Sequence, residues 1–264
     1  MKKKLLLVGL VAIIALLVSA CGGNGGSGGK SESGKSAYQL YNEASQKMKD
    51  AQSYAMNLDM KVDMDMGGHK MSLVTTGNLK QVSVSADNPE MEMDFNIVIP
   101  GQPNQSMKAY YKDGYYYVDM AGKKTKMAMP LEDVLKQANA AVLDLDQSMI
   151  KEQKVNGKEL SFTLDKAAMD KLVGDSVAGI LKQLSTQVGM TFSDVNVTAT
   201  LDDQNQLSTI NTKFSADVTA QGQTSKINYD MAMKVLQIGN VTIDLPKDLD
   251  SYTEATVPKA SSNQ

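Results

Sequence analysis

The stretch YAMNLDMKVDMDM, residues 54–66, alternates apolar and polar side chains and runs directly into Gly67 and Gly68. Every second residue is a tyrosine, methionine, leucine or valine, and the residues between them are polar or charged apart from Ala55. Strict period two over the whole stretch predicts a long β-strand with one buried face and one face in water. The two glycines predict a two-residue hairpin turn into a second strand.

The predicted turn sets the register of the two strands that it joins. Pairing outward from the glycines keeps apolar side chains on the same face of both strands, so the turn and the pattern agree. The expected pairs are Met66 with His69, Met64 with Met71, Val62 with Leu73, Met60 with Thr75 and Met56 with Leu79. A third strand over residues 91–99 repeats the pattern and points five side chains inward: Met91, Met93, Phe95, Ile97 and Ile99.

The stretch YYKDGYYYVD, residues 110–119, predicts a second hairpin. A type I′ turn at Asp113 and Gly114 pairs Tyr111 with Tyr116 on the methionine face. The same register points the other tyrosines outward beside lysines; these are Tyr110, Tyr115 and Tyr117, next to Lys108 and Lys112. A further turn at residues 121–122 leads into a strand over residues 124–129, so the segment reads as a meander.

Helices are expected at three places, between and before the strands. Ser36 and Gln39 form a capping box in front of an apolar stripe that runs to Ala51. Helical spacing of apolar residues recurs over residues 131–145 and 165–184. Further strands are expected near residues 160–164 and over residues 195–201, 207–218, 225–236 and 241–245. One-sided strands in long meanders predict an α+β fold with a single large antiparallel sheet, about 11 strands, that curves around its helices.

This pattern resembles the LolA/LppX-like lipoprotein carriers over residues 36–250. The resemblance lies in a helix that runs into Ser53 and Tyr54, in the Tyr-Tyr-Lys-Asp-Gly-Tyr hairpin at residues 110–115, and in the strand, turn and strand of residues 195–210. It implies an incomplete β-barrel that wraps a few helices and holds acyl chains of lipids or lipoproteins in the hollow between them. The similar proteins include Gram-positive lipoproteins.

The first 20 residues are typical of a lipoprotein signal peptide. Three lysines precede an apolar run over residues 5–18 that is short for a membrane-spanning helix. The sequence Val18-Ser19-Ala20-Cys21 resembles the bacterial lipobox, which implies cleavage after Ala20 and diacylation of Cys21 on sulfur. Cys21 is the only cysteine in the chain, so it forms no internal disulfide. We expect a lipid-anchored protein on the extracytoplasmic face of a Gram-positive cell membrane.

Polar segments flank the expected domain. Residues 22–35 are nearly all Gly, Ser, Asn, Lys and Glu, a composition typical of a flexible tether, so residues 21–35 form the link to the membrane. Residues 251–264 form a polar tail. The domain boundaries are therefore 1–20, 21–35, 36–250 and 251–264.

The composition argues against several functions. All 27 basic residues are lysine, and against 30 acidic residues they leave a net charge of −3, so nucleic-acid binding is not expected. With one histidine and one cysteine the chain cannot assemble a Cys/His pair or a multi-histidine metal site. No nucleophile elbow, zinc-protease motif, phosphate loop or dinucleotide fingerprint is present. We expect neither an enzyme nor a cofactor.

Methionine on the inward strand faces is the remaining signal for function. Methionine is flexible and polarizable, and it is over-used on apolar surfaces that adapt to varied partners. A cavity that binds a hydrophobic or amphiphilic ligand is the first hypothesis, and a core filled by its own side chains, in an envelope sensor or scaffold, is the alternative. The candidate lining residues are Met56, Leu58, Met60, Val62, Met64, Leu73, Met93, Phe95, Tyr111, Tyr116, Met231 and Met233.

Copper is a minor alternative. Four Met-x-Met pairs begin at residues 64, 91, 127 and 231, and Met66 and Met71 flank His69 around the first turn. Thioether and imidazole ligands suit Cu(I). Period-two methionine is also what any half-buried strand rich in methionine produces. The expected assignment is therefore no metal, and the sequence does not indicate an oligomeric state.

Overall fold

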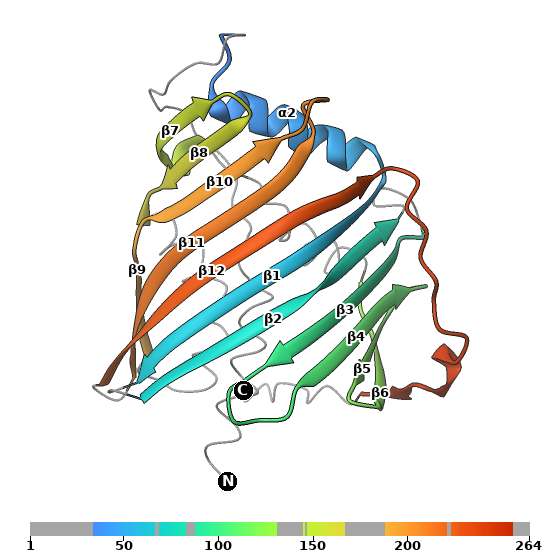
Figure 1. The fold of residues 1–264 in the computed structure, drawn as a ribbon. Helices are drawn as coiled ribbons and strands as arrows, with labels where there is room; N and C mark the ends of the chain where they lie inside the picture. Colours follow the sequence, from blue (N-terminus) through green and yellow to red (C-terminus); the bar gives the residue numbers. More distant parts are fainter. Residues whose placement is uncertain are drawn as a thin grey trace, which may run out of the picture.

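The computed structural model describes residues 34–66, 69–82, 88–130, 145, 147–166, 188–220 and 223–255. These residues form one open, mostly antiparallel sheet of 13 strands, with one α-helix, α2 (Ala37–Asp50), at one end (Figure 1). Two short 3-10 helices, η1 (Gln147–Met149) and η2 (Leu249–Ser251), complete the described elements.

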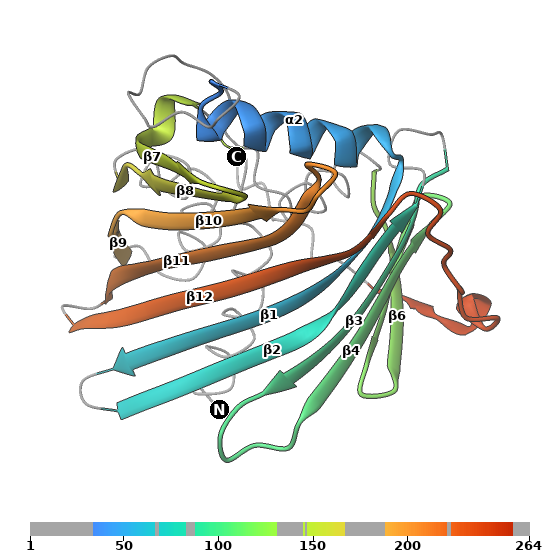
Figure 2. The same cartoon turned by 45° about the horizontal axis from the view of Figure 1, so that its top comes forward.

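The sheet consists of two meanders joined in the middle. The first contains β1 (Ser53–Met66), β2 (His69–Val82), β3 (Glu90–Val98), β4 (Gln105–Lys112), β5 (Tyr115–Met120) and β6 (Lys123–Ala128), in that spatial order. The second contains β7 (Ile150–Asn156), β8 (Glu159–Leu164), β10 (Val195–Leu201), β11 (Leu207–Ala220) and β12 (Gln223–Ile238). Antiparallel pairing of β1 with β12 joins them, and the sheet curves strongly between its two ends (Figure 2).

Two short strands lie outside this simple order. β9 (Val188–Phe192) pairs with the second part of β11, along the edge that β10 occupies over its first part. β13 (Thr253–Glu254) pairs in parallel with β6 and covers that edge of the sheet.

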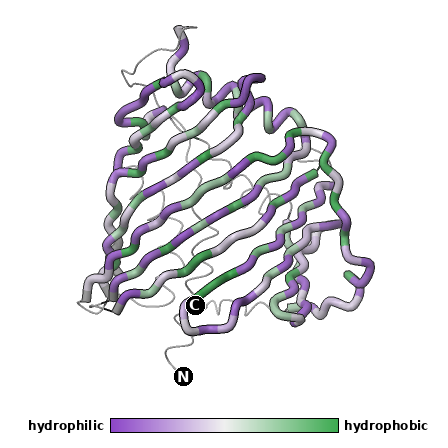
Figure 3. The backbone as a smooth tube through the Cα atoms, in the orientation of Figure 1, coloured by the Kyte–Doolittle hydropathy of each residue, from purple (hydrophilic) through white to green (hydrophobic). Residues whose placement is uncertain are grey.

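Both predicted hairpins are confirmed in register. β1 and β2 pair Met64 with Met71 and Met60 with Thr75, as the glycine turn requires. β4 and β5 pair Tyr111 with Tyr116, and the left-handed backbone of Asp113 and Gly114 (φ 50° and 81°) forms the turn between them. Hydrophilic and hydrophobic residues alternate along the central strands, as period two demands (Figure 3).

Helix α2 begins where its capping box predicts. The Gln39 N–H donates to Ser36 Oγ (3.2 Å), and the Ser36 N–H donates to Gln39 Oε1 (3.0 Å). One side of the helix is buried against β1, β7, β8 and β11, and it carries Ala37, Tyr41, Ala44, Ser45 and Met48. We call the face of the sheet that packs against α2 the inner face.

The observed elements differ from the expected ones in several places. The sheet has 13 strands rather than about 11, because β7, β9 and β13 carry too few apolar residues in period two to be recognised. Residues 241–245 form no strand, and the Val241 N–H donates instead to Ser53 Oγ (3.3 Å). The helices expected over 131–145 and 165–184 lie almost entirely outside the described residues.

The proposed polar tail also begins too early. Residues 249–251 form η2, and β13 follows directly within the segment assigned to that tail. Tyr252, between them, is only 4% exposed.

Candidate functional site

The structure places the predicted cavity residues together on the inner face. Cross-strand pairs connect them across six neighbouring strands, in the order β12, β1, β2, β3, β4 and β5. Leu58 lies opposite Met233, Met60 opposite Met231, and Tyr111 opposite Tyr116. The alternation therefore assigns these side chains to one surface correctly.

The candidate residues divide between two buried clusters. Met56, Tyr111 and Met233 belong to the cluster that includes α2, with Leu58, Met93, Tyr116 and Met231 packed at its margin. Met60, Val62, Met64 and Leu73 belong to a second cluster, nearer the turn between β1 and β2. Phe95 lies opposite Gly77, where a built Cβ would stand 2.3 Å from its ring. The open glycine position thus accommodates the phenylalanine.

Burial is uneven in the middle of the inner face. Met60 is 3% exposed, but its neighbours Leu58 and Met231 keep intermediate exposure. Apolar side chains of this size are usually either fully buried in a core or scattered singly on a surface. A contiguous half-buried set of methionine, leucine and aromatic residues has the character of a ligand-binding surface.

Sequence reasoning missed an aromatic group on the same face. Phe214 of β11 stacks on Tyr229 of β12 with ring centroids 4.6 Å apart, and Phe192 of β9 lies 5.9 Å from Phe214. Phe214 and Tyr229 are directly opposite in the register. The period-two patterns of β11 and β12 contained the signal, but the two residues between these strands, Gln221 and Gly222, were not recognised as a tight connection, so their pairing was not predicted.

Buried phenols add polar atoms to the inner face. Burial raises the pKa of Tyr116 and that of Tyr229 each to about 12, and it raises the pKa of Tyr54 further above its ordinary value. The Tyr54 hydroxyl donates to Gln81 Oε1, whereas the Tyr229 hydroxyl donates to Met231 Sδ at 3.2 Å. Thioether sulfur is a weak acceptor, so Tyr229 retains hydrogen-bonding capacity.

The outer face carries the charges. Lysines and carboxylates pair across neighbouring strands, for example Lys213 with Asp230 (2.8 Å) and Lys80 with Glu92 (3.0 Å). Such exposed pairs add little stability, but they keep the sheet soluble on that side. These charged pairs are thereby separated from the methionine surface.

The outward tyrosines are not in water as expected. Tyr110 and Tyr117 are 8% and 9% exposed because the C-terminal segment crosses over them. The ring of Tyr252 meets that of Tyr117 edge to face, with centroids 5.5 Å apart, and Leu245 and Leu249 pack beside them. The tyrosine hairpin thus has an inner pair that belongs to the candidate site and an outer set that holds the C-terminal segment.

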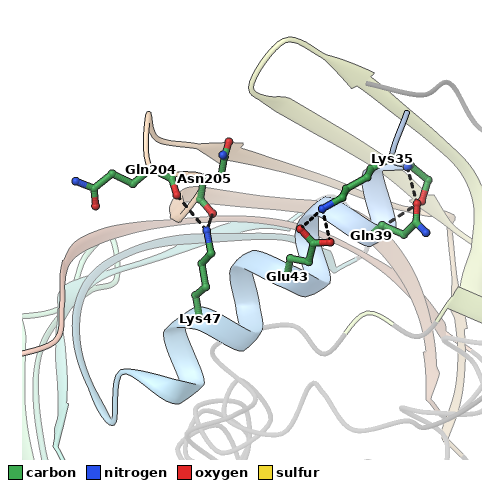
Figure 4. A network of polar contacts seen from close by, with 7 residues as sticks. Lys35, Gln39, Glu43, Lys47, Gln204 and Asn205 are labelled. Atoms are coloured by element: carbon green, nitrogen blue, oxygen red, sulfur yellow. Dashed lines mark hydrogen bonds and ion pairs between the residues drawn. The ribbon is translucent and has the colours of Figure 1, made fainter. Parts of the chain in front are cut away.

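The C-terminal part of helix α2 is also hydrogen-bonded to the second meander (Figure 4). The Lys47 ammonium donates to the backbone oxygens of Gln204 and Asn205, at 3.1 and 3.3 Å, in the turn between β10 and β11. Asp202 Oδ1 accepts the N–H groups of Gln204 and Gln206 within that turn. Polar contacts therefore hold the helix across one end of the inner face.

The described residues give two further results. No helix among them has the length and apolar character needed to cross a bilayer. Within the same residues, no three His, Cys, Asp or Glu side chains come together as metal ligands. The side chains of Met66 and His69, on which the copper alternative depends, lie outside what the structure describes.

The fold and the surface together define an α+β protein built on a single curved sheet with one apolar and one charged face. The chain belongs to the Family of unknown function (DUF6612), which matches residues 36–252. No curated protein matches the chain.

Three solved structures show limited similarity. A DUF1329 family protein from Desulfovibrio piger is 10% identical, with 79% of this chain and 93% of that chain covered and a TM-score of 0.28. The ywiB protein from Bacillus subtilis is 10% identical, with 72% and 98% covered and a TM-score of 0.23. A candidate outer membrane lipoprotein-sorting protein domain from Vibrio parahaemolyticus is 8% identical, with 81% and 96% covered and a TM-score of 0.26. These similarities establish no shared function.

Proposed function

We propose that this protein is a lipid-anchored extracytoplasmic lipoprotein that binds an acyl chain or another amphiphile on the inner face of its sheet. The observation that carries the proposal is the continuous inner face, which holds no Lys, Asp or Glu at the described positions of β1, β3 and β11 and which carries methionine and aromatic side chains, several of them half buried. Methionine adapts its shape to an irregular apolar partner, as a binder of flexible chains requires. The protein performs no covalent chemistry in this proposal.

The resemblance of the sequence to the LolA/LppX-like carriers supports the same function. In those carriers an incomplete barrel wraps helices around acyl chains. The open curved sheet and α2 are the corresponding parts here. Diacylated Cys21 and the tether would hold the domain next to the bilayer from which its ligand is taken.

A second candidate function is a non-catalytic envelope sensor or scaffold whose inner face is filled by its own side chains. The observation in its favour is the burial of Met60, Val62 and Met64, each no more than 5% exposed. In that case the outer face and the C-terminal segment would contact partners, and no lipid would be bound.

Ligand content distinguishes the two candidates. The chain from residue 21 onward, with Cys21→Ser to prevent anchoring, would be purified and examined by native mass spectrometry and by organic extraction. A fluorescent acyl probe would then be added, both as a fatty acid and as its glycerol ester. We expect a co-purified lipid or uptake of a probe; a clean protein mass with no uptake of either probe would exclude the binding function.

Matched variants on one strand locate the site. Met231 and Leu236 both lie on β12, but Met231 faces inward and Leu236 is 55% exposed at a position without a partner on β1. Met231→Gln should weaken uptake about tenfold, which corresponds to about 1.4 kcal/mol, whereas Leu236→Gln should leave it unchanged. Cu(I) added to the same samples tests the copper alternative, which fails if no metal binds below micromolar concentration.

A further inference from the structure

A row of paired residues crosses the centre of the inner face. Thr75 of β2 lies opposite Met60 of β1, Met60 lies opposite Met231 of β12, and Met231 lies opposite Thr212 of β11. Both threonines are buried, Thr75 at 8% and Thr212 at 5% exposure. We call these four residues the central row. In this row a methionine pair is flanked by one threonine hydroxyl on each side.

The hydroxyl of Thr212 has an unused hydrogen-bonding capacity. Its Oγ1 is buried and has no hydrogen-bond partner among the residues that the structure describes. Buried polar atoms in folded proteins are nearly always paired, so an unpaired one calls for a partner. Valine has the same shape and an equal preference for strands, so packing alone does not require the hydroxyl.

A second hydroxyl lies next to the central row. Tyr229 is on the same face of β12 as Met231, two residues away, and its hydroxyl donates only to the Met231 sulfur among the contacts that the structure describes. A ligand oxygen is a stronger acceptor than a thioether. Two hydroxyl groups with spare hydrogen-bonding capacity are therefore neighbours of the same methionine, Met231.

The described inner-face positions around this group carry no charged side chain. Along β1, β3, β10 and β11, and over residues 71–81 of β2 and 225–235 of β12, the inner-face positions in the described register hold no Lys, Asp or Glu. The chain also contains no arginine. A carboxylate or phosphate taken into such a place would lose its hydration without gaining a counter-charge, which is strongly unfavourable.

We infer that the central row binds the polar group of the ligand and that this group is uncharged: an ester, an amide or a hydroxyl. The inference rests on the proposed function and narrows it to neutral lipids. Thr212 Oγ1 makes the specific hydrogen bond, Tyr229 supports it, and the methionines contact the adjacent acyl chain. Thr212 is thus a specificity-determining residue, and lipids with an ionised head group bind less well.

Competition between two lipids of equal chain length tests the inference. Monooleoylglycerol and oleate would each displace a fluorescent acyl probe from the Cys21→Ser chain that begins at residue 21. We expect the glycerol ester to bind more tightly than oleate. Thr212→Val should weaken the ester about tenfold, because one hydrogen bond to a buried group is lost, and should change oleate little.

Thr209→Val is the matched control, since Thr209 is on the same strand but faces the other side of the sheet, opposite Lys234. It should leave the affinities of both lipids unchanged. The thermal midpoint of the ligand-free protein is a second readout. Thr212→Val should keep or raise that midpoint, because the valine removes an unpaired buried hydroxyl.

The outcomes separate this inference from the function on which it rests. Equal affinity for ester and oleate, or an equal loss of both in Thr212→Val, would overturn the assignment of a neutral head group while leaving lipid binding intact. A lower thermal midpoint for ligand-free Thr212→Val would show that the hydroxyl is paired within the protein, and would overturn it too. No binding of any lipid would overturn both.

Discussion

Two buried tyrosines on the inner face, Tyr229 and Tyr116, make the free energy of unfolding depend on pH in the alkaline range. Burial raises the pKa of Tyr229 to about 12, whereas an unfolded tyrosine titrates at about 10. The neutral phenol is therefore favoured by folding. Its stabilising contribution is complete below about pH 10 and is lost as the pH rises through the folded value of about 12. Tyr116 has the same sign and the same window.

We predict that the free energy of unfolding falls between pH 10 and pH 12 and that Tyr229→Phe reduces this fall by about 1 to 2 kcal/mol, because phenylalanine cannot ionise. Urea unfolding followed by circular dichroism at pH 8, 10 and 11 would measure it. The pH 8 value is the control, since the phenol is neutral there in both states. An unchanged slope in the variant would show that Tyr229 is solvated in the folded protein.

At the scale of single elements, β2 and β3 approach each other closely at Gly77. Gly77 of β2 lies opposite Phe95 of β3, and a Cβ built on Gly77 would stand 2.2 Å from the carbonyl oxygen of Asp94. No left-handed backbone is involved, so the need for glycine comes from close approach alone. An aromatic ring over a strand glycine supplies the packing that the glycine lacks.

We predict that Gly77→Ala destabilises the domain by about 1 to 3 kcal/mol, the usual cost of forcing extra volume into a packed site. The Asp94 contact is with backbone and cannot move aside by a rotamer change. Chemical denaturation of the purified domain measures the effect, with Thr76→Ala on the outer face as the neighbouring control. Equal stability of Gly77→Ala and the unaltered protein would mean that β2 and β3 separate more easily than the register indicates.

The hairpins were predictable as elements because their turns are local. Gly67 with Gly68, and Asp113 with Gly114, leave one register that keeps the apolar residues on one face, and both registers are confirmed. β9 and β13 were not predictable, because strands of five and two residues provide too little pattern to be distinguished from loop. The burial of Tyr110 and Tyr117 was missed for a related reason, since the segment that covers them is irregular.

At the scale of the whole molecule, the pairing of β1 with β12 makes one sheet out of two meanders. These strands are 14 and 16 residues long, and they pair along nearly their whole length. The one irregularity is a shift of register between Ala55 and Met56, where Leu236 of β12 has no partner on β1. β12 also pairs with β11 on its other side. β12 is therefore hydrogen-bonded on both sides at the junction of the two meanders.

We predict that Ala232→Pro in β12 abolishes the fold of both meanders. Proline removes a ladder hydrogen bond at a central position where Ala232 lies opposite both Asp59 and Asn211, and the cost should exceed about 3 kcal/mol. Circular dichroism and limited proteolysis would show loss of structure in the whole domain. Ala232→Val, which suits a strand, is the control and should remain folded. Survival of either meander in the proline variant would show that the two halves fold separately.

Sequence alone determined the faces of the strands, the start of α2 and the two tight hairpins, because period two, capping and turn chemistry act over a few residues. It also brought the candidate lining residues to one face, since all of them follow the same alternation. Tertiary structure decided which distant strands meet: β1 with β12, and β13 with the edge of β6. Many pairings of half-apolar strands satisfy the same alternation, and only simultaneous packing of the whole chain selects one. The unpaired hydroxyl of Thr212 became visible only through that selection, because the pairing of β11 with β10 and β12 places it on the inner face beside Met231.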